Sequence, residues 1–505
     1  MTGQAALAAA GQTVARLPWA RVIVSEAVWQ QACSELGQGS LELLSLWADD
    51  KMVNLALRDP REGAPVIFSY ESSNGRFPSV GASHPAAIRL ERAICDLFGL
   101  EPVGLPDTRR WLDHGCWPVT HPLSGAEPRG GAGDPYTFLP AEGDGLHQIP
   151  VGPVHAGVIE PGHFRFTASG EAIVRLEERL GYVHKGIDGL MMGADLAQAS
   201  RLAGRTSGDS AVAYQFGFAR AVEAAYGFEP PVRAHYLRGL VAELERLANH
   251  LGDIGDICND ASFALMQAHC AVLRERVLRA ADAAFGHRLM RDVIVVGGVA
   301  KDVDPAGMAE IRKLVGEIRH KLPPLISLYD TTTSLQDRTV GTGTLGSKLA
   351  SDFAAGGFVG RASGRAFDAR RALPYAPYDR LAFDVPVRTE GDVNARVWVR
   401  IREIEQSLGL VDQLIEGMPA GPVLGGALLQ SPSRSVEGVS LVEGFRGDIL
   451  IAVRIGLDGR VERCHMRDPS WFQWPLLEAA IEGNIVADFP LCNKSFNCSY
   501  SGHDL

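Results

Sequence analysis

The segment from Arg233 to Asp253 constrains the fold more than any other part of the sequence. Its leucines recur every three or four residues and therefore fall on one face of a helix, at Leu237, Leu240, Leu244, Leu247 and Leu251. A second long helical pattern runs from about Ala264 to Ala284. These two patterns predict a region of the chain that is rich in helices.

Length and composition limit the interpretation further. The chain has 505 residues, too many for one ordinary core, and its 46% apolar and 22% charged residues are typical of a folded globular protein. A formal charge of −11 argues against a nucleic-acid-binding protein, because such proteins normally present a basic face. No apolar run approaches the roughly 18 residues of a membrane helix. No signal peptide is expected either, so any membrane association must come from partner subunits.

Three regions can be distinguished along the chain. Residues 1–115 are predicted to form a small α+β domain, with strand-like or helical runs at Arg21–Val24, Val53–Leu57, Val66–Tyr70 and Pro85–Leu97. Residues 116–150 are rich in glycine and proline, which is typical of a linker. Residues 151–505 are predicted to form a larger, helix-rich domain with minor β-structure, because strand-like runs return at Asp448–Ile455 and Val461–Met466. The predicted fold class is therefore α+β.

The glycine-rich segment at 341–346 and the cysteines give weaker evidence of function. Residues Gly341–Gly346 spell GxGxxG, but a dinucleotide site needs a buried strand before it, and residues 331–340 make a poor one. We therefore favour a structural loop. The eight cysteines include no CxxC pair, and we expect reduced, mostly buried thiols.

Several polar residues are candidates for a functional site, each with a simpler alternative. His155 lies in a run rich in glycine and proline, where it can reach a ligand or merely cap backbone groups. Ser207, Asp209 and Ser210 precede a helix and suit its N-cap. The sequence Asp-Pro-Ser at 468–470 is typical of an ordinary turn.

The predicted helix over 233–253 also carries a polar stripe. Glu243, Arg246, His250 and Asp253 are spaced three, four and three residues apart and share one face. Because that face points away from the leucines, we expect it to be solvated and laced with ion pairs. Asn249 and His250 are unusual choices for a purely solvating face, so a functional role stays open.

Taken together and in order, eight segments resemble the family that joins nickel–iron hydrogenase large subunits to the 49-kDa subunit of complex I. The segments are GPVHAGVIEPGHFRF, GE at 170–171, GYVHKGID, RTSGDSAVAY, AELERLANHLGDIGD, DRTVGTG, GRASGRAFDARR and GDVNARVWVRIREIEQSL. With the Asp-Pro-Ser turn they span about Gly152 to Ser470. In the first domain, ERAICDLFGL at 91–100 and LPDTRR at 105–110 are similar to the signature of the 30-kDa subunit of complex I. Such a fusion also resembles the large subunits of energy-converting (group 4) hydrogenases.

The chain departs from the hydrogenases at their metal ligands. Those enzymes hold nickel and iron with four thiolates, from an RxCGxC motif and a C-terminal DPCxxC motif. The positions that match these thiolates are Ser207, Ser210, Ser470 and Gln473. Hydroxyls and an amide are hard, neutral groups that cannot replace thiolates around a soft nickel–iron centre. The family's histidine after the first motif is Tyr214 here. The resemblance thus implies that this chain binds no such metal centre and has no hydrogenase activity.

What remains resembles complex I, in which a quinone headgroup occupies the corresponding cavity. The family's quinone-binding histidine matches His155, and the aspartate paired with it aligns with Asp260. An imidazole in this position can donate a hydrogen bond to a quinone carbonyl and stabilise the charge that develops on reduction. The family's partner tyrosine falls at Gly204, so Tyr182 or Tyr214 would have to substitute for it.

The resemblance also assigns roles to other residues. Asp188 matches a proton-relaying glutamate of hydrogenases, and with His155 and Asp260 it makes up the predicted catalytic set. The quinone or acceptor cavity is predicted to comprise His155, Tyr182, Ser207, Ser210, Tyr214 and Ser470. A proton path is predicted along His184, Glu243, His250 and Asp253.

The implied function is that of a subunit in a membrane-associated, complex I-like redox complex. Electrons would pass from an iron–sulfur cluster in a small partner subunit to a quinone or similar acceptor. This electron transfer would be coupled to proton or sodium translocation by antiporter-like membrane subunits. The chain itself would bind no cofactor or nucleic acid, and would lie peripherally on the cytoplasmic face of the inner membrane. Two alternatives stay open. One is a non-catalytic scaffold of a hydrogenase-4-like complex, and the other is a metalloenzyme that uses Cys464, His465, Cys492, Cys498 and His503.

Overall fold

The N-terminal part of the chain folds around a five-stranded sheet in the computed structural model, which describes residues 3–16, 18–61, 63–131, 133, 135–156, 159–425 and 431–505. The strand order is β1 (Gln12–Arg16), β2 (Ala20–Ile23), β5 (Val66–Glu71), β4 (Met52–Arg58) and β3 (Glu42–Asp49). Strands β2 and β5 run parallel, and the other neighbours are antiparallel. The strands predicted over 21–24, 53–57 and 66–70 are thus confirmed.

The central strands of this sheet are apolar because both of its faces are covered. Helices α2 (Glu26–Gly37) and α3 (Ile88–Phe98) belong to a core on one face, in which Trp29 is fully buried. On the other face, Leu44 packs in a smaller cluster with Leu450 of the C-terminal sheet. A strand covered on both sides buries most of its residues, which explains the nearly continuous apolar runs.

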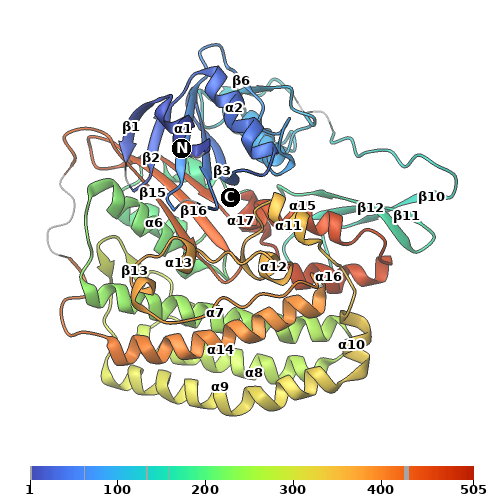
Figure 1. Ribbon diagram of the computed structural model, residues 1–505, viewed down its shortest axis with the longest axis vertical. Coiled ribbons are helices and arrows are strands. Elements are labelled where there is room, and N and C mark those ends of the chain that lie inside the picture. Colours follow the sequence, from blue (N-terminus) through green and yellow to red (C-terminus); the bar gives the residue numbers. More distant parts are fainter. Residues whose placement is uncertain are drawn as a thin grey trace.

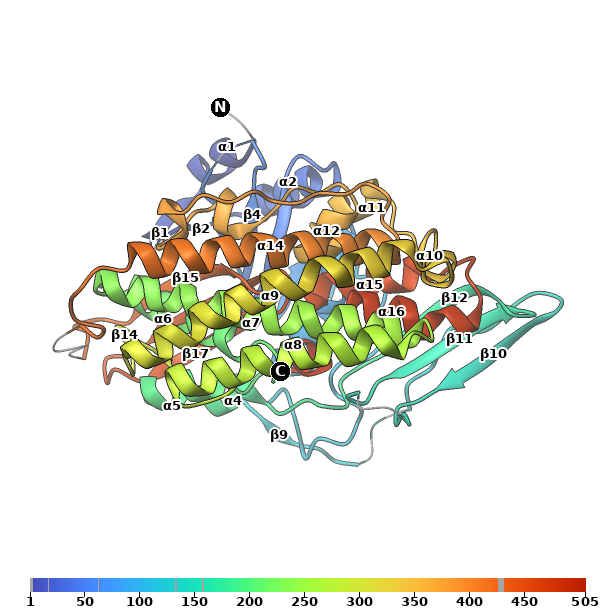
Figure 2. The same ribbon diagram turned by 90° about the horizontal axis from the view of Figure 1, so that it is seen from below.

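Between the five-stranded sheet and a second, projecting sheet the chain contains little regular structure. The short elements there are β6 (Arg76–Pro78), a 3₁₀ turn (Pro85–Ala87), β7 (Glu101–Val103), β8 (Val119–Thr120) and β9 (Glu127–Pro128), and a short helix, α1 (Gly3–Ala9), precedes the first sheet. An antiparallel sheet then follows, composed of β10 (Leu146–Val151), β11 (His163–Ser169) and β12 (Ala172–Arg179). In Figures 1 and 2 this sheet extends away from the body of the molecule.

Four long helices form a layer on the side opposite the N-terminal sheet (Figures 1 and 2). They are α7 (Val232–Asp260), α8 (Ala264–Phe285), α9 (Pro305–Thr331) and α14 (Val393–Gly417). The two helices predicted from the sequence are confirmed, although α7 continues seven residues beyond the expected end at Asp253.

A C-terminal sheet lies between the N-terminal sheet and the helical layer (Figure 1). Its strands β15 (Val436–Glu443), β16 (Asp448–Ile455) and β17 (Val461–Arg467) form an antiparallel meander, and α6 (Ala211–Tyr226) packs against it. The remaining elements are short: α4 (Ile187–Met191), α5 (Leu196–Ala203), β13 (Ile294–Val295), β14 (Gly298–Val299), α10 (Thr333–Thr339), α11 (Ser347–Asp352), α12 (Gly357–Ala362), α13 (Ala369–Ala372), α15 (Ser470–Ala480), α16 (Phe489–Phe496), α17 (Tyr500–Asp504), and 3₁₀ turns at Tyr378–Arg380 and Val486–Asp488.

The fold class is α+β, as predicted, with 44% of the residues in helices and 18% in strands. The residues 341–346 connect α10 to α11 and follow a helix rather than a strand, which agrees with a structural loop. The N-terminal core is continuous with C-terminal residues, since Trp29 and Trp474 belong to the same cluster. Within the described residues, no helix has both the length and the apolar character that crossing a membrane requires.

Candidate functional site

Four of the predicted cavity residues lie together in the interior, between the start of α6 and the C-terminal segment. The Ser207 hydroxyl donates to the carboxylate of Asp209 at 2.7 Å, and the Ser210 hydroxyl donates to the same oxygen at 3.3 Å. Tyr214 donates its hydroxyl proton to Asp468 at 2.6 Å. The hydroxyl of Ser470 accepts the backbone N–H of Ser499 at 2.8 Å. We refer to Ser207, Asp209, Ser210, Tyr214, Arg446, Asp468, Ser470 and Ser499 as the hydroxyl cluster.

Ser499 is a member of this cluster that the sequence did not reveal. Its hydroxyl lies 3.0 Å from the hydroxyl of Ser207 and accepts the backbone N–H of Gly502 at 2.8 Å. Gln473 instead donates to the carbonyl oxygens of Gly356 and Arg446, at 3.2 and 2.9 Å. Ser499 and Gly502 have the spacing of the C-terminal thiolates, so the geometry favours this pair, rather than Ser470 and Gln473, as the positions facing Ser207.

The guanidinium of Arg446 is the main positive charge of the cluster. It donates to Asp209 at 2.6 Å, to the hydroxyl of Ser210 at 3.2 Å and to the carbonyl of Asn497 at 2.5 Å. Its carbon atom lies 4.5 Å from the centre of the Phe445 ring. Burial by itself would raise the pKa of Asp209, but the charge of Arg446 and the hydrogen bonds from Arg446, Ser207 and Ser210 together outweigh burial, and the pKa is lowered. The carboxylate is therefore ionised at neutral pH.

The donor atoms of the cluster do not suit a nickel–iron centre. They are hydroxyl oxygens, carboxylates and a guanidinium, whereas a soft metal centre requires thiolates. The sulfur nearest in sequence belongs to Cys498, and burial raises the pKa of this thiol well above its usual value. The thiol therefore stays protonated. Either assignment of the C-terminal pair leaves no cysteine at the positions of the four thiolates.

Gly204, which replaces the family's tyrosine, ends α5 next to the cluster's first serine. A Cβ atom at this position would lie 2.7 Å from the side-chain amide carbon of Gln215. The Gln215 side chain is held in place by hydrogen bonds with Asp292 and with the carbonyl of Ser200. The space beside Gly204 is therefore already filled, and a larger side chain would require Gln215 to move.

The polar stripe of α7 is buried, so the expectation of a solvated face is wrong. Glu243 is fully buried and accepts hydrogen bonds from Arg370, Tyr378 and Ser407 at 2.9, 2.6 and 2.6 Å. His250 is fully buried as well, and its Nε2 lies 2.7 Å from the carboxylate of Glu403. The stripe is indeed laced with ion pairs, but its charged partners, Arg370 on α13 and Arg400 and Glu403 on α14, are themselves buried.

The buried charges continue toward the hydroxyl cluster. Arg361 joins Glu403 to Glu443 through contacts of 2.7 and 2.9 Å. Asp253 accepts from Arg400 at 3.1 Å and from the side-chain amide of Asn497 at 2.8 Å. Because the carbonyl of Asn497 in turn accepts from Arg446, residues of the stripe and of the cluster share one neighbour.

His155 and Asp260 form hydrogen bonds and charge contacts with other groups rather than with each other. Nε2 of His155 lies 2.8 Å from the carbonyl of Gly162, within its own loop. Asp260 ends α7, where burial raises the pKa of its carboxyl and the nearby charge of Lys494 opposes that rise. The pairing implied by the family resemblance therefore remains a prediction.

Two more predicted residues lie near the C-terminal helix α17. Tyr182 is 37% exposed and its ring meets that of His114 edge-on at 4.6 Å. His184 stacks on Trp117 at 4.7 Å, and its Nδ1 lies 2.7 Å from the carbonyl of Asp504. Neither side chain is hydrogen-bonded to the hydroxyl cluster in the structure.

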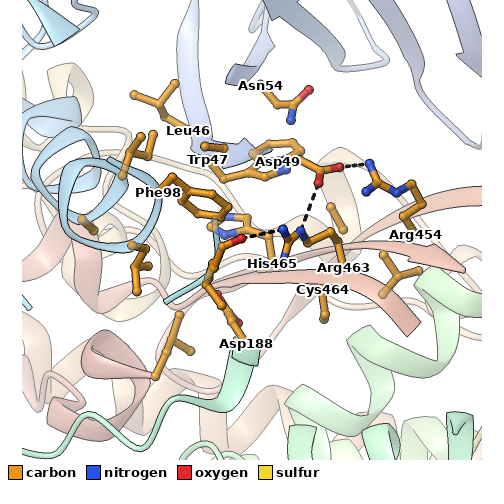
Figure 3. Close-up of a pocket in the computed structure, with 18 of the residues that line it drawn as sticks. Leu46, Trp47, Asp49, Asn54, Phe98, Asp188, Arg454, Arg463, Cys464 and His465 are labelled. Atoms are coloured by element: carbon orange, nitrogen blue, oxygen red, sulfur yellow. Dashed lines mark hydrogen bonds and ion pairs between the residues drawn. The ribbon is translucent and has the colours of Figure 1, made fainter. Parts of the chain in front are cut away.

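Asp188 lies at a different place, in a cavity of about 350 Å³ between the N-terminal sheet and the C-terminal sheet (Figure 3). One of its carboxylate oxygens is enclosed and has no hydrogen-bond partner among the described residues. Burial raises the pKa of this carboxyl to about 7, against the opposing charge of Arg463. Asp188 is therefore titratable near neutral pH.

The C-terminal cysteines and histidines lie in different parts of the structure. Cys464 and His465 line the cavity beside Asp188, whereas Nε2 of His503 accepts the indole N–H of Trp111 at 3.1 Å. Among the residues that the structure describes, no three histidine, cysteine, aspartate or glutamate side chains are placed to hold a metal ion together.

Comparison with known proteins places the chain in a class. The family model for the "Respiratory-chain NADH dehydrogenase, 30 Kd subunit" matches residues 23–131, and that for the 49 Kd subunit matches residues 262–436. The fold and these matches define an oxidoreductase subunit in which a 30-kDa-like part and a 49-kDa-like part are fused.

Relatives along most of the chain specify the family. Formate hydrogenlyase subunit 5 of Escherichia coli (strain K12) is 32% identical over 87% of this chain and 79% of its own length. Hydrogenase-4 component G of the same organism is 32% identical, with 86% and 77% covered. The C/D subunit of the NADH-quinone oxidoreductase of Phocaeicola vulgatus is 28% identical, with 77% and 82% covered. The chain belongs to the family of complex I 49-kDa and 30-kDa subunits and group 4 hydrogenase subunits, as its motifs predicted.

Proposed function

We propose that this chain works in a membrane-associated redox complex and passes electrons from an iron–sulfur cluster of a partner subunit to a quinone or similar small acceptor. The hydroxyl cluster carries the proposal. At the positions where hydrogenases hold their metals, this chain gathers hydroxyls, two carboxylates and a guanidinium. These groups do not suit nickel and iron, but they suit a polar organic acceptor. No hydrogenase activity is expected, and the chain itself would bind no cofactor.

The cluster contains the donors that quinone reduction needs. The phenol of Tyr214 and the guanidinium of Arg446 are buried donors, and such groups stabilise negative charge more strongly than water-exposed ones. The loop of His155 adjoins the same segment, because Glu160 accepts the backbone N–H of Ser501 at 2.9 Å. The imidazole of His155 would serve as a further donor to an acceptor bound beside this segment.

Protons would reach the acceptor along the buried charges of α7 and α14. His250 is hydrogen-bonded to Glu403 at 2.7 Å, and Asp253 and Asn497 form a second hydrogen-bonded group that reaches Arg446, with distances of 2.8 and 2.5 Å. His184 and Asp188 would serve a second approach from the inter-sheet cavity. Antiporter-like membrane subunits would couple this protonation to proton or sodium movement.

A peripheral position at the cytoplasmic face of the inner membrane follows from the same proposal. One relative, 31% identical over 69% of this chain and 85% of its own length, is the membrane-bound hydrogenase subunit alpha of Pyrococcus furiosus. A small iron–sulfur subunit and the membrane subunits would hold this chain in place.

The test is reoxidation of the dithionite-reduced, intact complex by a short-chain quinone, followed through the iron–sulfur absorbance. His155→Ala and Tyr214→Phe should each slow reoxidation by at least about tenfold, because each removes a proton donor that general acid catalysis would use. His320→Ala, on the exposed face of α9, is the matched control and should leave the rate unchanged. Reoxidation of the unmodified complex no faster than the uncatalysed rate would overturn the proposal.

A scaffold subunit is the second candidate. It is favoured by the filled space beside Gly204 and by the mutual pairing of the cluster's polar groups. A scaffold should tolerate His155→Ala and Asp260→Asn in the assembled complex without loss of turnover. Any cost should appear only in the stability of the complex.

A further inference from the structure

The cavity that contains Asp188 lies within this chain and is enclosed by both of its major parts (Figure 3). Strand β3 and helix α3 form one wall, with Leu46, Trp47 and Phe98 among the lining residues. Strands β16 and β17 and the start of α4 form the other wall. A volume of about 350 Å³ lies within the range of sites for small organic molecules. The hydroxyl cluster contributes none of the lining residues.

The walls present flat aromatic surfaces. The ring of His465 stacks on Trp47, with centroids 5.0 Å apart and planes 7° from parallel. Nε2 of this histidine lies 2.8 Å from the hydroxyl of Ser45, and burial lowers the pKa of His465 to about 3, so the imidazole is neutral. Aliphatic and aromatic side chains make up most of the remaining surface. Such walls favour a flat, apolar ring.

Among the described residues, the charged side chains that line the cavity have polar partners, except for one oxygen of Asp188. Asp49 is paired with Arg454 and with Arg463, the latter at 3.2 Å, and Arg21 is paired with Glu437 at 2.6 Å. The ammonium of Lys185 donates to the carbonyls of Arg205 and Thr206. Asp188 remains, and its enclosed oxygen accepts no hydrogen bond among the described residues.

We propose that this cavity binds a small, flat aromatic molecule that carries a cationic nitrogen, with the ring against Trp47 and His465 and the nitrogen on Asp188. A carboxylate enclosed by apolar groups is costly unless a cation or donor compensates it. Arg463 does not fill that role, because its Nε and Nη2 donors bind Asp49, Asp50 and the carbonyl of Leu123, and its Nη1 lies against the sulfur of Met192. The ligand would supply the missing partner. The site shares no lining residue with the hydroxyl cluster, but it shares Asp188 with the second proton approach proposed above.

Three probes of nearly equal shape test the proposal by calorimetric titration of the full chain at pH 8. Benzamidine is a flat aromatic cation, benzamide is its neutral analogue and benzoate is the anion. Benzamidine should bind at least tenfold more tightly than benzamide, and benzoate should bind least. Asp188→Asn should remove the preference for benzamidine over benzamide. Asp379→Asn, which alters an exposed carboxylate outside the cavity, should leave that preference unchanged.

Proton linkage gives a second readout. Binding of the cation requires the ionised carboxylate, whose pKa is raised to about 7. Benzamidine binding should therefore weaken by about tenfold from pH 8 to pH 6, as the carboxylate takes up its proton. The titratable or charged groups that line the cavity with Asp188 are Arg463, Cys464 and His465 on β17, Arg454 on β16, Asp49 on β3, Arg21 on β2, Glu437 on β15, and His184 and Lys185 on its own segment. The pH dependence of benzamidine binding supports the proposal only if Asp188→Asn abolishes it.

A filling variant provides an independent check if Asp188→Asn is poorly folded. Ala452 lines the cavity, and Ala452→Leu should weaken all three probes without altering any charge. The proposal fails if benzamidine and benzamide bind equally to the unmodified chain. It also fails if no probe binds, or if Ala452→Leu leaves benzamidine binding intact.

Discussion

Replacing Arg361 with methionine removes the cation on which two buried carboxylates depend. The guanidinium lies 2.7 Å from Glu403 and 2.9 Å from Glu443, and all three side chains are at most 1% exposed. It also donates to the carbonyl of Phe367 at 2.8 Å. Methionine has a similar length and no charge, so the substitution tests the ionic contacts with little change in packing.

The expected cost follows from the burial of the pair. Removing one partner of a buried ion pair leaves an uncompensated charge and typically costs about 3–5 kcal/mol. Arg246 remains 3.6 Å from Glu403, so the lower end of that range, about 3 kcal/mol, is expected. Adding Glu443→Gln neutralises one stranded carboxylate and should restore about 1–2 kcal/mol, a usual coupling energy for residues in contact.

The assay is urea unfolding of the full chain, followed by circular dichroism of the helices. Arg402→Met is the matched control, because Arg402 is 52% exposed on the same helix as Glu403 and forms a surface ion pair with Glu405. A surface pair of this kind should contribute less than about 1 kcal/mol. A cost below about 1 kcal/mol for Arg361→Met, or a double variant less stable than the single one, would refute the reasoning.

Two further predictions concern pH and backbone packing. Burial raises the pKa of Glu245 to about 8 and that of Glu443 to about 7. Since their unfolded values lie near about 4.3, the folded chain binds more protons at these two groups. Burial lowers the pKa of histidines such as His250 and His465, which opposes this effect below about pH 6.5, so the free energy of unfolding should fall as pH rises from 7 to 8. Urea titrations at four pH values would show this, and a flat or rising profile would contradict it. Gly357 has a φ of +61° and a Cβ there would lie 2.0 Å from the carbonyl of Arg446, so Gly357→Ala should lower the melting temperature sharply. Gly316→Ala, in an open position of α9, should raise stability by about 0.5–1 kcal/mol, and equal effects of the two substitutions would count against the packing argument.

The parts of the fold that depend on local periodicity could be predicted from the sequence. The leucine spacing of α7 determined the helix and its apolar face, because five leucines in register require no knowledge of partners. The burial of the opposite face could not be predicted in this way. Its partners Arg370, Ser407 and Glu403 lie more than 120 residues further along the chain. Only the packing of α13 and α14 on α7 turns a polar stripe into an interior one.

The same distinction holds for the candidate site: residues in a contiguous motif could be predicted, and residues that join through tertiary contacts could not. Ser207, Ser210 and Tyr214 were found because the family's motif is contiguous there. Ser499 and Arg446 escaped, because each lies in a loop without periodicity and joins the cluster only through tertiary contacts. A signal was available for Arg446, since a lone arginine in the Gly-Phe-Arg-Gly turn between two strand-like, largely apolar runs is an unusual residue to bury. For Ser499, the two-residue spacing to Gly502 was the available signal.

One wall of the inter-sheet cavity comes from the part that the 30-kDa family model matches, the other comes from segments on either side of the 49-kDa match, and all of them belong to a single polypeptide. Its walls therefore meet in a fixed one-to-one ratio and at an effective concentration set by the connecting segment, in the millimolar range for short links. Dilution cannot separate them, whereas two independent subunits would separate according to their affinity. For any ligand bound in the cavity, the fusion converts an assembly-dependent site into one that exists as soon as the chain has folded.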